Sequence, residues 1–249
     1  MTSPGDEAYR FYGELARWWP LISPVDDYAE EAAFAAALLA TAQVPVREVL
    51  ELGSGGGHNA AHLREHFTMT LADLSPQMVA MSRELNPDCA HHVGDMRTLR
   101  LGREFDAVFV HDAVDYMTTE DDLRGAIATA YAHCRPGGVA VFVPDDVAES
   151  YEPGSDLGGS DGPDGRGVRF LEWSWDPDPA DTWTLTQYAF LLREADGAVR
   201  TVHETHRTGL FPRRVWLELL GAAGFSPQVR LEETAEERRP REVFLAHRR

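Results

Sequence analysis

The sequence contains no lysine, so all 23 of its Lys-plus-Arg residues are arginines, against 41 aspartates and glutamates. A Schiff-base lysine and a lysine general base are therefore excluded. The formal net charge of -18 also disfavours anionic partners, because an acidic surface repels nucleic-acid phosphates and anionic lipids. We expect the partner to be a small molecule, with no role for nucleic acid or a membrane surface.

Cysteine is scarce and long apolar runs are absent. The two cysteines, Cys89 and Cys134, exclude a disulfide scaffold and leave no CxxC pair for a metal. No stretch approaches the roughly 20 apolar residues that span a bilayer, and the first residues lack the basic and apolar segments of a secretory signal. We predict no metal site and a cytoplasmic location.

Short apolar strands alternate with helices between residues 45 and 145. The predicted strands cover 48–52, 69–73, 90–93, 105–110 and 139–143. This alternation predicts βαβ units in an α/β fold, with helices on both faces of a parallel sheet. Ser75 and Pro76 have the residue types of a helix N-cap and first helical position.

The remaining regions add to this core within one predicted domain of 249 residues. Residues 1–44 are predicted to be a helical lid, interrupted at Pro20 and Pro24. Residues 146–211 are predicted to hold a loop, rich in Gly, Pro and Asp over 153–167, and an antiparallel meander of three strands. Residues 212–249 are predicted to form a helix and two closing strands.

A glycine loop follows the first strand, with Gly53, Gly55 and Gly57 after Leu52. Glycines at the carboxyl edge of a parallel sheet let a ligand approach the backbone. Asp73 ends the second strand, where a carboxylate can accept both ribose hydroxyls of a nucleoside. Asp95 and Met96 follow the third strand, where they can contact an adenine ring. The pattern predicts a nucleoside-containing cofactor.

Two cofactor classes compete for this loop. A dinucleotide fingerprint requires a third glycine where His58 stands, and it places pyrophosphate on the helix N-terminus. Glu51, just before the loop, would repel pyrophosphate. S-adenosylmethionine has no phosphate, and its ammonium group suits a nearby carboxylate.

Residues 45–145 resemble class I S-adenosylmethionine-dependent methyltransferases, with the motifs in order at normal spacing. The resemblance implies a Rossmann-like, mostly parallel sheet, with S-adenosylmethionine as cofactor and S-adenosylhomocysteine as product. It also implies that the three glycines line the cofactor, that Asp73 holds the ribose, that Leu74 and Met78 flank the adenine, and that Asp95 and Met96 contact it.

The flanking regions narrow the resemblance to small-molecule enzymes. Residues 11–20 look like the lid helix of small-molecule methyltransferases, with Tyr12 and Trp19 at its two aromatic positions and Gly13 and Pro20 in place of its aspartates. Residues 203–211 and the following helix resemble the C-terminal part of nucleotide-linked aminosugar N-methyltransferases, which also insert an antiparallel meander.

The loop after the fourth strand is the predicted catalytic region. His111, Asp112, Asp115 and Tyr116 offer an imidazole, two carboxylates and a phenol, and His111 also adjoins the cofactor set. A methyl acceptor must be deprotonated before it attacks, and carboxylates near a sulfonium can also hold a cationic amine. A capping role for Asp112 and a solvated position for Asp115 are the alternatives.

We therefore predict N-methylation of a small-molecule amine, in secondary metabolism. The first alternative is O-methylation of a phenol or sugar hydroxyl, with His111 as the base. An NAD(P)-dependent oxidoreductase and a non-catalytic cofactor-binding protein are more remote.

Several further patterns have two interpretations each. His58, His62 and His66 share a helix face, which can bind metal but is expected to be solvated. The tryptophans of the meander, Trp173, Trp175 and Trp183, suit core packing or a homodimer contact at least as well as an aromatic substrate wall. Arg207 can clamp a substrate anion or pair with Glu204. The charge run 232–241 is expected to be a solvated loop.

Overall fold

The computed structural model describes residues 9–232 and 240–249. Its main sheet has the strand order β10-β11-β5-β4-β1-β2-β3. Strands β1 to β5 pair in parallel, whereas β11 is antiparallel to both β5 and β10. The predicted mostly parallel α/β sheet is therefore confirmed. The strands are β1 (Glu48–Leu52), β2 (Thr68–Asp73), β3 (Ala90–Val93), β4 (Phe105–Val110), β5 (Cys134–Phe142), β10 (Phe225–Glu232) and β11 (Arg241–Arg248).

Helices cover both faces of this sheet, which explains its uninterrupted apolar strands. Helices α5 (Glu120–His133) and α6 (Arg213–Ala223) pack on the face that carries Leu50 and Val108. Helices α2 (Ala29–Leu39) and α3 (His58–Leu63) pack on the opposite face, which carries Val49 and Phe109. All four of these strand residues are fully buried. Alternate side chains therefore enter two separate cores.

Helix α4 (Pro76–Leu85) begins as the sequence predicts. The Ser75 hydroxyl accepts a hydrogen bond from the Met78 backbone N–H at 3.2 Å, and Pro76 occupies the first turn. The cap fixes the point at which the chain leaves β2, directly after Asp73. None of the helices in residues 9–232 and 240–249 is long and apolar enough to cross a membrane.

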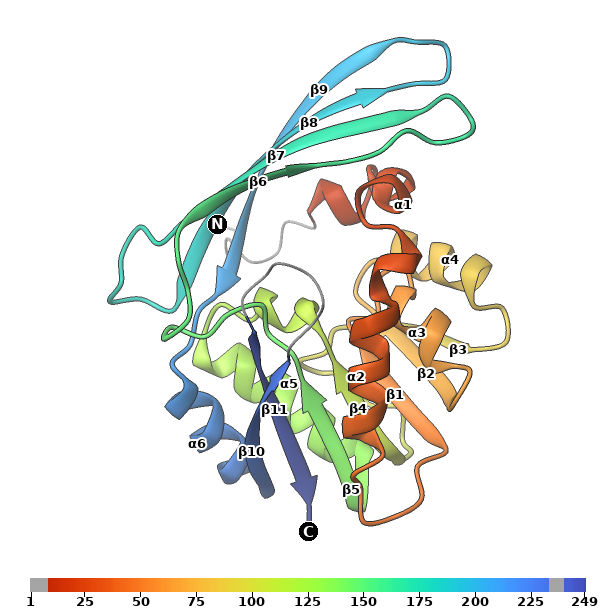
Figure 1. The fold of residues 1–249 in the computed structure, drawn as a ribbon. Helices are drawn as coiled ribbons and strands as arrows, with labels where there is room; N and C mark the ends of the chain where they lie inside the picture. The colour runs from red at the N-terminus through yellow and green to blue at the C-terminus, as the bar shows by residue number, and fades with distance from the viewer. Residues whose placement is uncertain (1–8, 233–239) are drawn as a thin grey trace.

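A second, antiparallel sheet lies across the carboxyl end of the main sheet (Figure 1). It contains β6 (Gly154–Gly158), β7 (Gly167–Trp175), β8 (Trp183–Arg193) and β9 (Val199–Gly209). The three-strand prediction was incomplete, because β6 lies within the segment expected to be a loop. Its backbone pairs with β7 at the sheet edge. Edge pairing needs backbone groups rather than an apolar side-chain pattern, so the Gly- and Asp-rich composition concealed it.

The N-terminal lid lies between the two sheets (Figure 1). It consists of η1 (Arg10–Tyr12), η2 (Ala16–Trp18), α1 (Trp19–Ile22) and η3 (Val25–Tyr28), leading into α2. Pro20 lies in the first turn of α1 instead of interrupting a helix, because the first turn needs no proline N–H. Phe11 and Trp18 are buried against Phe190 and Val202 of the second sheet. This packing holds the lid over the glycine loop.

Candidate functional site

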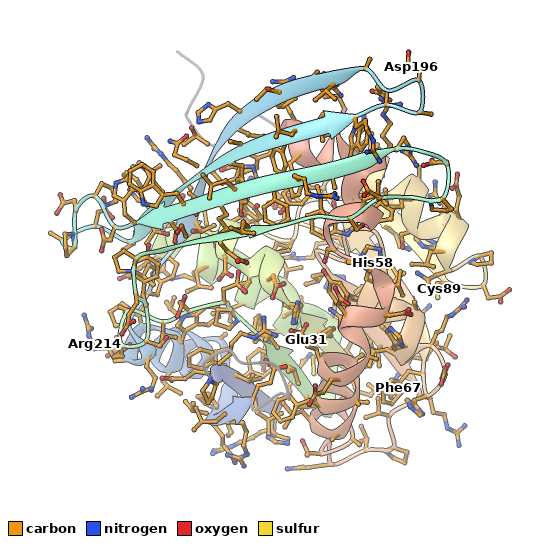
Figure 2. The ribbon with its side chains drawn as sticks, turned by 45° about the horizontal axis from the view of Figure 1, so that its top comes forward. Glu31, His58, Phe67, Cys89, Asp196 and Arg214 are labelled. Carbon is orange, nitrogen blue, oxygen red and sulfur yellow. The ribbon has the colours of Figure 1, made fainter. Side chains whose placement is uncertain are left out.

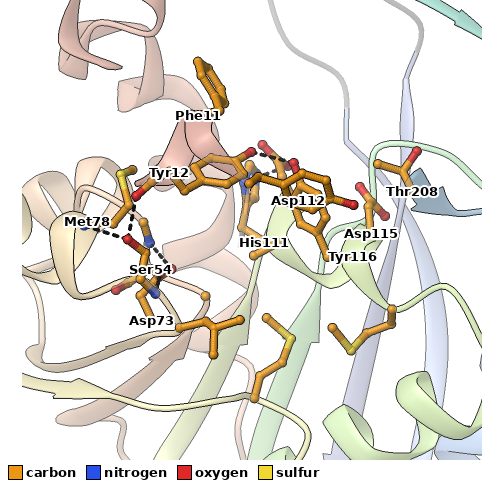
Figure 3. Close-up of a pocket in the computed structure, with 18 of the residues that line it drawn as sticks. Phe11, Tyr12, Ser54, Asp73, Met78, His111, Asp112, Asp115, Tyr116 and Thr208 are labelled. Carbon is orange, nitrogen blue, oxygen red and sulfur yellow. Dashed lines mark hydrogen bonds and ion pairs between the residues drawn. The ribbon is translucent and has the colours of Figure 1, made fainter. Parts of the chain in front are cut away.

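A cavity of about 1200 Å³ lies where the glycine loop, the lid, η4 (Asp112–Tyr116) and the second sheet meet. Figure 3 shows its central residues, with Asp73 and Met78 on one side and the η4 residues on the other. It brings together every predicted site residue except Gly57. The predicted residues that line it are Tyr12, Trp19, Glu51, Gly53, Gly55, Asp73, Leu74, Met78, Asp95, Met96, His111, Asp112, Asp115 and Tyr116.

The glycines of the loop have different structural roles. Gly53 has φ +74°, and a Cβ there would lie 2.3 Å from the Cβ of Ala113, so glycine allows η4 to pack against the loop. Gly57, expected to line the cofactor, does not line the cavity. A Cβ on Gly57 would lie 2.3 Å from the Ser82 Oγ and 2.4 Å from the Asn86 Nδ2. Gly57 therefore allows α3 to approach α4.

Asp73 is oriented by the backbone on both sides of it. Its Oδ2 accepts the Gly55 N–H at 2.8 Å, and its Oδ1 accepts the Ser75 N–H at 2.8 Å. Each carboxylate oxygen can accept more than one hydrogen bond. The carboxylate lines the cavity with its orientation fixed, which suits two ribose hydroxyls.

Two buried polar atoms beside the glycine loop lack partners. Glu51 is 2% exposed, and its Oε2 has no hydrogen-bond partner; the Ser54 Oγ lacks one too. Burial raises the pKa of Glu51 to about 8. Both residues line the cavity. A cationic, hydrogen-bonding ligand group, such as an ammonium, would satisfy them.

The predicted adenine end contains an ion pair that the sequence did not indicate. Both oxygens of Asp95 accept hydrogen bonds from the Arg97 guanidinium. Arg97 also donates to Asp122 at 2.9 Å. The pair fixes the loop after β3, from which Met96 lines the cavity. Leu74, which is 62% exposed, lines the cavity from the end of β2.

His111 is buried with both ring nitrogens engaged by the protein. Its Nδ1 lies 2.8 Å from the Asp112 Oδ1, and its Nε2 lies 3.3 Å from the Glu31 Oε2 and 3.2 Å from the Arg241 Nη2. Burial alone would lower the pKa of His111, but the Asp112 and Glu31 carboxylates outweigh it and raise that pKa to about 10. His111 therefore lacks the free basic nitrogen that a general base requires.

The two aspartates of η4 differ in ionisation. Burial acts to raise the pKa of Asp112, but His111 and then Arg241 lower it to about 2. Burial, followed by repulsion from Asp145, raises the pKa of Asp115 well above its usual range. Asp115 is 6% exposed and its Oδ2 accepts the Asp145 N–H at 2.9 Å. Asp115 is therefore not solvated, so that alternative is wrong, and the N-cap residue of η4 is His111 rather than Asp112.

Tyr116 joins η4 to the lid and to the second sheet. Its hydroxyl lies 2.7 Å from that of Tyr12 and 2.9 Å from the His206 Nδ1. Burial raises the pKa of Tyr116 well above its usual range, so it remains a neutral phenol. The inward face of β9 carries Glu204 and His206, both buried, and the Glu204 carboxylate accepts the Phe11 N–H at 3.0 Å. That face therefore looks toward the lid and the site.

Known proteins resemble the chain over nearly its whole length. A methyltransferase domain family matches residues 49–138. The dTDP-3-amino-3,6-dideoxy-alpha-D-glucopyranose N,N-dimethyltransferase of Streptomyces fradiae is 31% identical, over 87% of this chain and 85% of that protein. This chain therefore belongs to the methyltransferase domain family.

Solved structures agree with this assignment. The sugar N-methyltransferase KedS8 from Streptoalloteichus has a TM-score of 0.80 at 27% identity, covering 100% of this chain and 97% of that one. The S-adenosylmethionine-bound amino pentose methyltransferase CalS10 from Micromonospora echinaspora has a TM-score of 0.74 at 27% identity, covering 98% and 99%.

These findings confirm the predicted cofactor and reaction. The protein is an enzyme that transfers a methyl group from S-adenosylmethionine to a small-molecule amine of secondary metabolism, with S-adenosylhomocysteine as product. The oxidoreductase and non-catalytic alternatives are set aside.

The methyltransferase site depends on Arg241, which the sequence analysis missed. Arg241 is 9% exposed and contacts Glu31 at 2.8 Å, Glu232 at 2.7 Å, Asp112 at 3.1 Å and Asp145 at 3.3 Å. The expected solvated loop is therefore wrong at both ends, which are buried in β10 and β11; residues 233–239 lie outside the described residues. No local signal marks Arg241, because Glu31, Asp112 and Asp145 are 96 to 210 positions away.

The histidines of α3 were also misjudged. His58 is buried, and its Nδ1 accepts the Trp19 indole N–H at 2.7 Å, which attaches the lid to the glycine loop. The His62 Nε2 lies 2.9 Å from the Val25 carbonyl oxygen. Of the three histidines expected to be solvated, only His66 is exposed. In the described part of the chain, no group of His, Cys, Asp and Glu side chains has metal-site geometry.

Proposed function

We propose that this methyltransferase methylates the amino group of an amino sugar. Its curated relatives carry amino-sugar substrates in their names, among them enzymes of Streptomyces fradiae and Streptomyces venezuelae. The second sheet closes over the cavity with aromatic side chains, including Tyr188 and Phe190. Such a wall suits the apolar face of a sugar ring.

The engagement of His111 is the observation that favours an amine over a hydroxyl. A neutral amine attacks through its own lone pair, whereas a hydroxyl needs a base that removes its proton during attack. His111 is held between Asp112, Glu31 and Arg241. His111, the base that O-methylation would require, is therefore held in a network of ion pairs and is not free to accept a proton from a hydroxyl.

The protein contributes binding, orientation and the exclusion of water. S-adenosylmethionine supplies an electrophilic methyl group on a sulfonium. We propose that Glu51 contacts its ammonium, that Asp73 holds its ribose, and that Gly53, Gly55, Leu74, Met78 and Met96 line the rest of its site. The Tyr12–Tyr116 pair would orient the acceptor nitrogen about 3 Å from the methyl carbon, and the lid would exclude water.

The test compares an amine with its matched hydroxyl. The purified enzyme would be given the methyl glycosides of 3-amino-3,6-dideoxyglucose and of 6-deoxyglucose, with methyl-labelled S-adenosylmethionine. We expect label to enter the amino sugar only. Faster labelling of the hydroxyl sugar would reject the proposal.

The outward face of the second sheet is the proposed site of assembly. The outward face of the second sheet exposes Leu157, Leu171, Trp173 and Leu191, with 76, 49, 57 and 50% of their surface accessible. Leu157 and Leu171 are register partners, so they form a continuous apolar row. We propose that a second copy covers this face in a homodimer.

We also propose a cytoplasmic location and a single domain. The free thiols of Cys89 and Cys134 support a reducing location such as the cytoplasm, and all four regions of the chain would act as one domain.

A further inference from the structure

A buried histidine and a buried glutamate of β9 lie behind the tyrosine pair of the cavity. We propose that His206 and Glu204 are positioning residues, which fix the direction of the hydrogen bonds made by Tyr116 and Tyr12. The Tyr12 oxygen then faces the cavity as a hydrogen-bond acceptor only. An amine donates an N–H to it and keeps its lone pair for the methyl group. The inference rests on the proposed amine methylation and gives β9 a part in that reaction.

His206 is enclosed by side chains of the protein. It is 1% exposed, and its ring centre lies 4.1 Å from that of Tyr9 and 4.9 Å from that of Tyr188. Because the ring is buried, its neighbours determine which ring nitrogen carries the proton. The titratable groups that face it come from the lid, η4, β8 and β9 itself, and they are Tyr9, Tyr12, Tyr116, Tyr188 and Glu204.

Glu204 selects the ring nitrogen that is protonated. Its Oε2 accepts the Phe11 N–H at 3.0 Å, which holds the carboxylate in place. Its Oε1 lies 3.5 Å from the His206 Nε2, a buried nitrogen that has no hydrogen-bond partner within the described part of the chain. A bare Nε2 would direct its lone pair at the carboxylate, whereas an Nε2–H directs a positive hydrogen there. We therefore expect the proton on Nε2, which leaves Nδ1 as an acceptor.

The two tyrosines transmit this choice to the cavity. The His206 Nδ1 lies 2.9 Å from the Tyr116 hydroxyl, which lies 2.7 Å from the Tyr12 hydroxyl. A hydroxyl has one proton to donate. Tyr116 donates its proton to Nδ1, so its oxygen accepts the proton of Tyr12, and only lone pairs of the Tyr12 oxygen remain for a ligand. Burial raises the pKa of both phenols, which keeps them neutral.

An oxygen that only accepts hydrogen bonds suits an attacking amine. Tyr12 lines the cavity, and its carbonyl oxygen accepts the Ser75 hydroxyl at 2.6 Å, which places it beside Asp73 and the cofactor end. The neutral amine donates one N–H to Tyr12. Its lone pair forms the N–C bond as the C–S bond breaks, and the sulfur keeps the bonding electrons. The product is a methylated ammonium, so charge and atoms balance. A Tyr12 hydroxyl that donated to the amine would instead occupy the attacking lone pair.

Glu204→Gln should reverse the direction of these hydrogen bonds. The Phe11 N–H requires an oxygen, so the amide oxygen takes the place of Oε2 and the amide NH2 faces the His206 Nε2. Nε2 then accepts a hydrogen bond, and Nδ1 carries the proton. The hydroxyls of Tyr116 and Tyr12 both turn round, and Tyr12 donates to the amine lone pair.

The first test observes the His206 tautomer in the enzyme saturated with S-adenosylhomocysteine, with no methyl acceptor present. Long-range proton–nitrogen NMR spectra of protein with isotope-labelled histidine distinguish the two tautomers from the protonated ring, and His206→Phe assigns the signal. Near neutral pH, we expect Nε2–H in the wild type and Nδ1–H in Glu204→Gln. An Nδ1–H ring or a doubly protonated ring in the wild type would overturn the proposal.

The second test separates kcat from KM. The probe is dTDP-linked 3-amino-3,6-dideoxyglucose, the type of sugar named for the Streptomyces fradiae relative. Glu204→Gln should lower kcat about 25-fold, because the amine loses one hydrogen bond and must break another at its lone pair, each worth about fivefold. KM should change less than about twofold, because a hydrogen bond to Tyr12 forms in either direction. An unchanged kcat, or a loss confined to KM, would reject the assigned role.

A second substitution should partly restore the activity of Glu204→Gln. Adding Tyr116→Phe cuts the connection between the His206 ring and Tyr12, so the Tyr12 hydroxyl is free to turn. We expect kcat to recover from about 25-fold to about fivefold below the wild type, which is the level of Tyr116→Phe alone. A structural defect at Glu204 would add to the loss instead, so a double variant no faster than Glu204→Gln would contradict the proposal.

The matched control is Asp196→Asn, at the β8–β9 turn away from the cavity (Figure 2). The Asp196 Oδ1 accepts the Ala198 N–H at 2.9 Å, much as Glu204 accepts the Phe11 N–H. The control therefore removes a carboxylate of the same sheet that also holds a backbone N–H. It should leave kcat, KM and the His206 tautomer unchanged. An equal loss of kcat in the control would assign the effect to sheet charge and overturn the proposal.

The outcomes separate this inference from the proposed function, because the tautomer is measured without an acceptor. An Nδ1–H ring in an enzyme that methylates the amino sugar rejects the inference alone. An Nε2–H ring that reverses in Glu204→Gln, in an enzyme that methylates no amino sugar, rejects the proposed substrate and leaves the direction of the hydrogen bonds in place.

Discussion

The phenol oxygens of Tyr12 and Tyr116 lie 2.7 Å apart, although 104 residues separate them in sequence. Tyr12 belongs to the lid and Tyr116 to η4, so this hydrogen bond joins the cover of the cavity to its floor (Figure 3). Tyr116 also lies 2.9 Å from the His206 Nδ1, which extends the connection to the second sheet. This hydrogen-bonded chain therefore joins three separate parts of the sequence at the cavity.

We expect Tyr12→Phe and Tyr116→Phe to lower kcat about fivefold each, because the loss of one hydrogen bond costs about 1 kcal/mol. The double variant should be no slower than the slower single variant, since both changes remove the same bond. Steady-state kinetics on the amino-sugar glycoside would measure this. If kcat of the double variant is lowered by the product of the two single effects, the two hydroxyls act independently.

Glu51 should release a proton when the cofactor binds. Burial raises its pKa to about 8 in the free enzyme, so the carboxyl is mostly protonated near pH 7. A cofactor ammonium lowers that pKa, which expels about one proton and strengthens binding as pH rises toward 8. Calorimetry of S-adenosylhomocysteine in two buffers of different ionisation enthalpy would count the protons. Glu51→Gln should abolish the release; equal release in that variant would assign the proton to another group.

The His111 network should make stability fall at high pH. The folded pKa of His111 is raised to about 10 by Asp112 and Glu31 against an ordinary value of 6.5. The contribution of protonated His111 to the free energy of unfolding is therefore fully present below about pH 6.5, and it is lost as pH rises through about 10. Between those values, we expect the unfolding free energy of the wild type to fall about 2–4 kcal/mol more than that of His111→Gln. Parallel urea titration curves for the two proteins would contradict this.

Arg241→Gln should be strongly destabilising, by about 3–5 kcal/mol, because it leaves the carboxylates of Glu31, Asp112 and Glu232 without their shared cation. Arg230→Gln, on the exposed side of the same hairpin, is the matched control and should change stability by less than about 0.5 kcal/mol. Denaturant unfolding would compare them. Similar losses in both would show that Arg241 contributes no more than a surface arginine.

Trp173→Glu should convert the proposed dimer into a monomer, because it places a charge in the middle of the apolar face. Sedimentation velocity would report the mass of the wild type and the variant. Leu74→Glu is a useful comparison, because Leu74 is also exposed but lies at the cavity, and it should keep the dimer. A monomeric wild type would reject the interface.

Much of the fold was predictable because its signals are local. The apolar runs of β1 and β4, the glycine loop after β1 and the cap at Ser75 each depend on neighbouring residues. Because the carboxyl ends of parallel strands meet at one edge, sequence order alone brought Asp73, Met96 and His111 to the same cavity. The cofactor followed from that edge together with the methyltransferase resemblance, and methylation of an amine followed from the acidic loop after β4 and the resemblance of residues 203–211.

Only the tertiary structure decided the chemistry of the acceptor side. His111 has the residue type of a general base, but Glu31 and Arg241, far away in sequence, make it part of an ionic network. Gly57 has the loop position of a cofactor contact, yet Ser82 in α4 and Asn86 at its C-cap determine its role. Strand β6 has no apolar pattern, so it is recognised only from its backbone pairing with β7. Sequence thus determined which groups reach the site, whereas burial and long-range charge pairs determined their protonation and their partners.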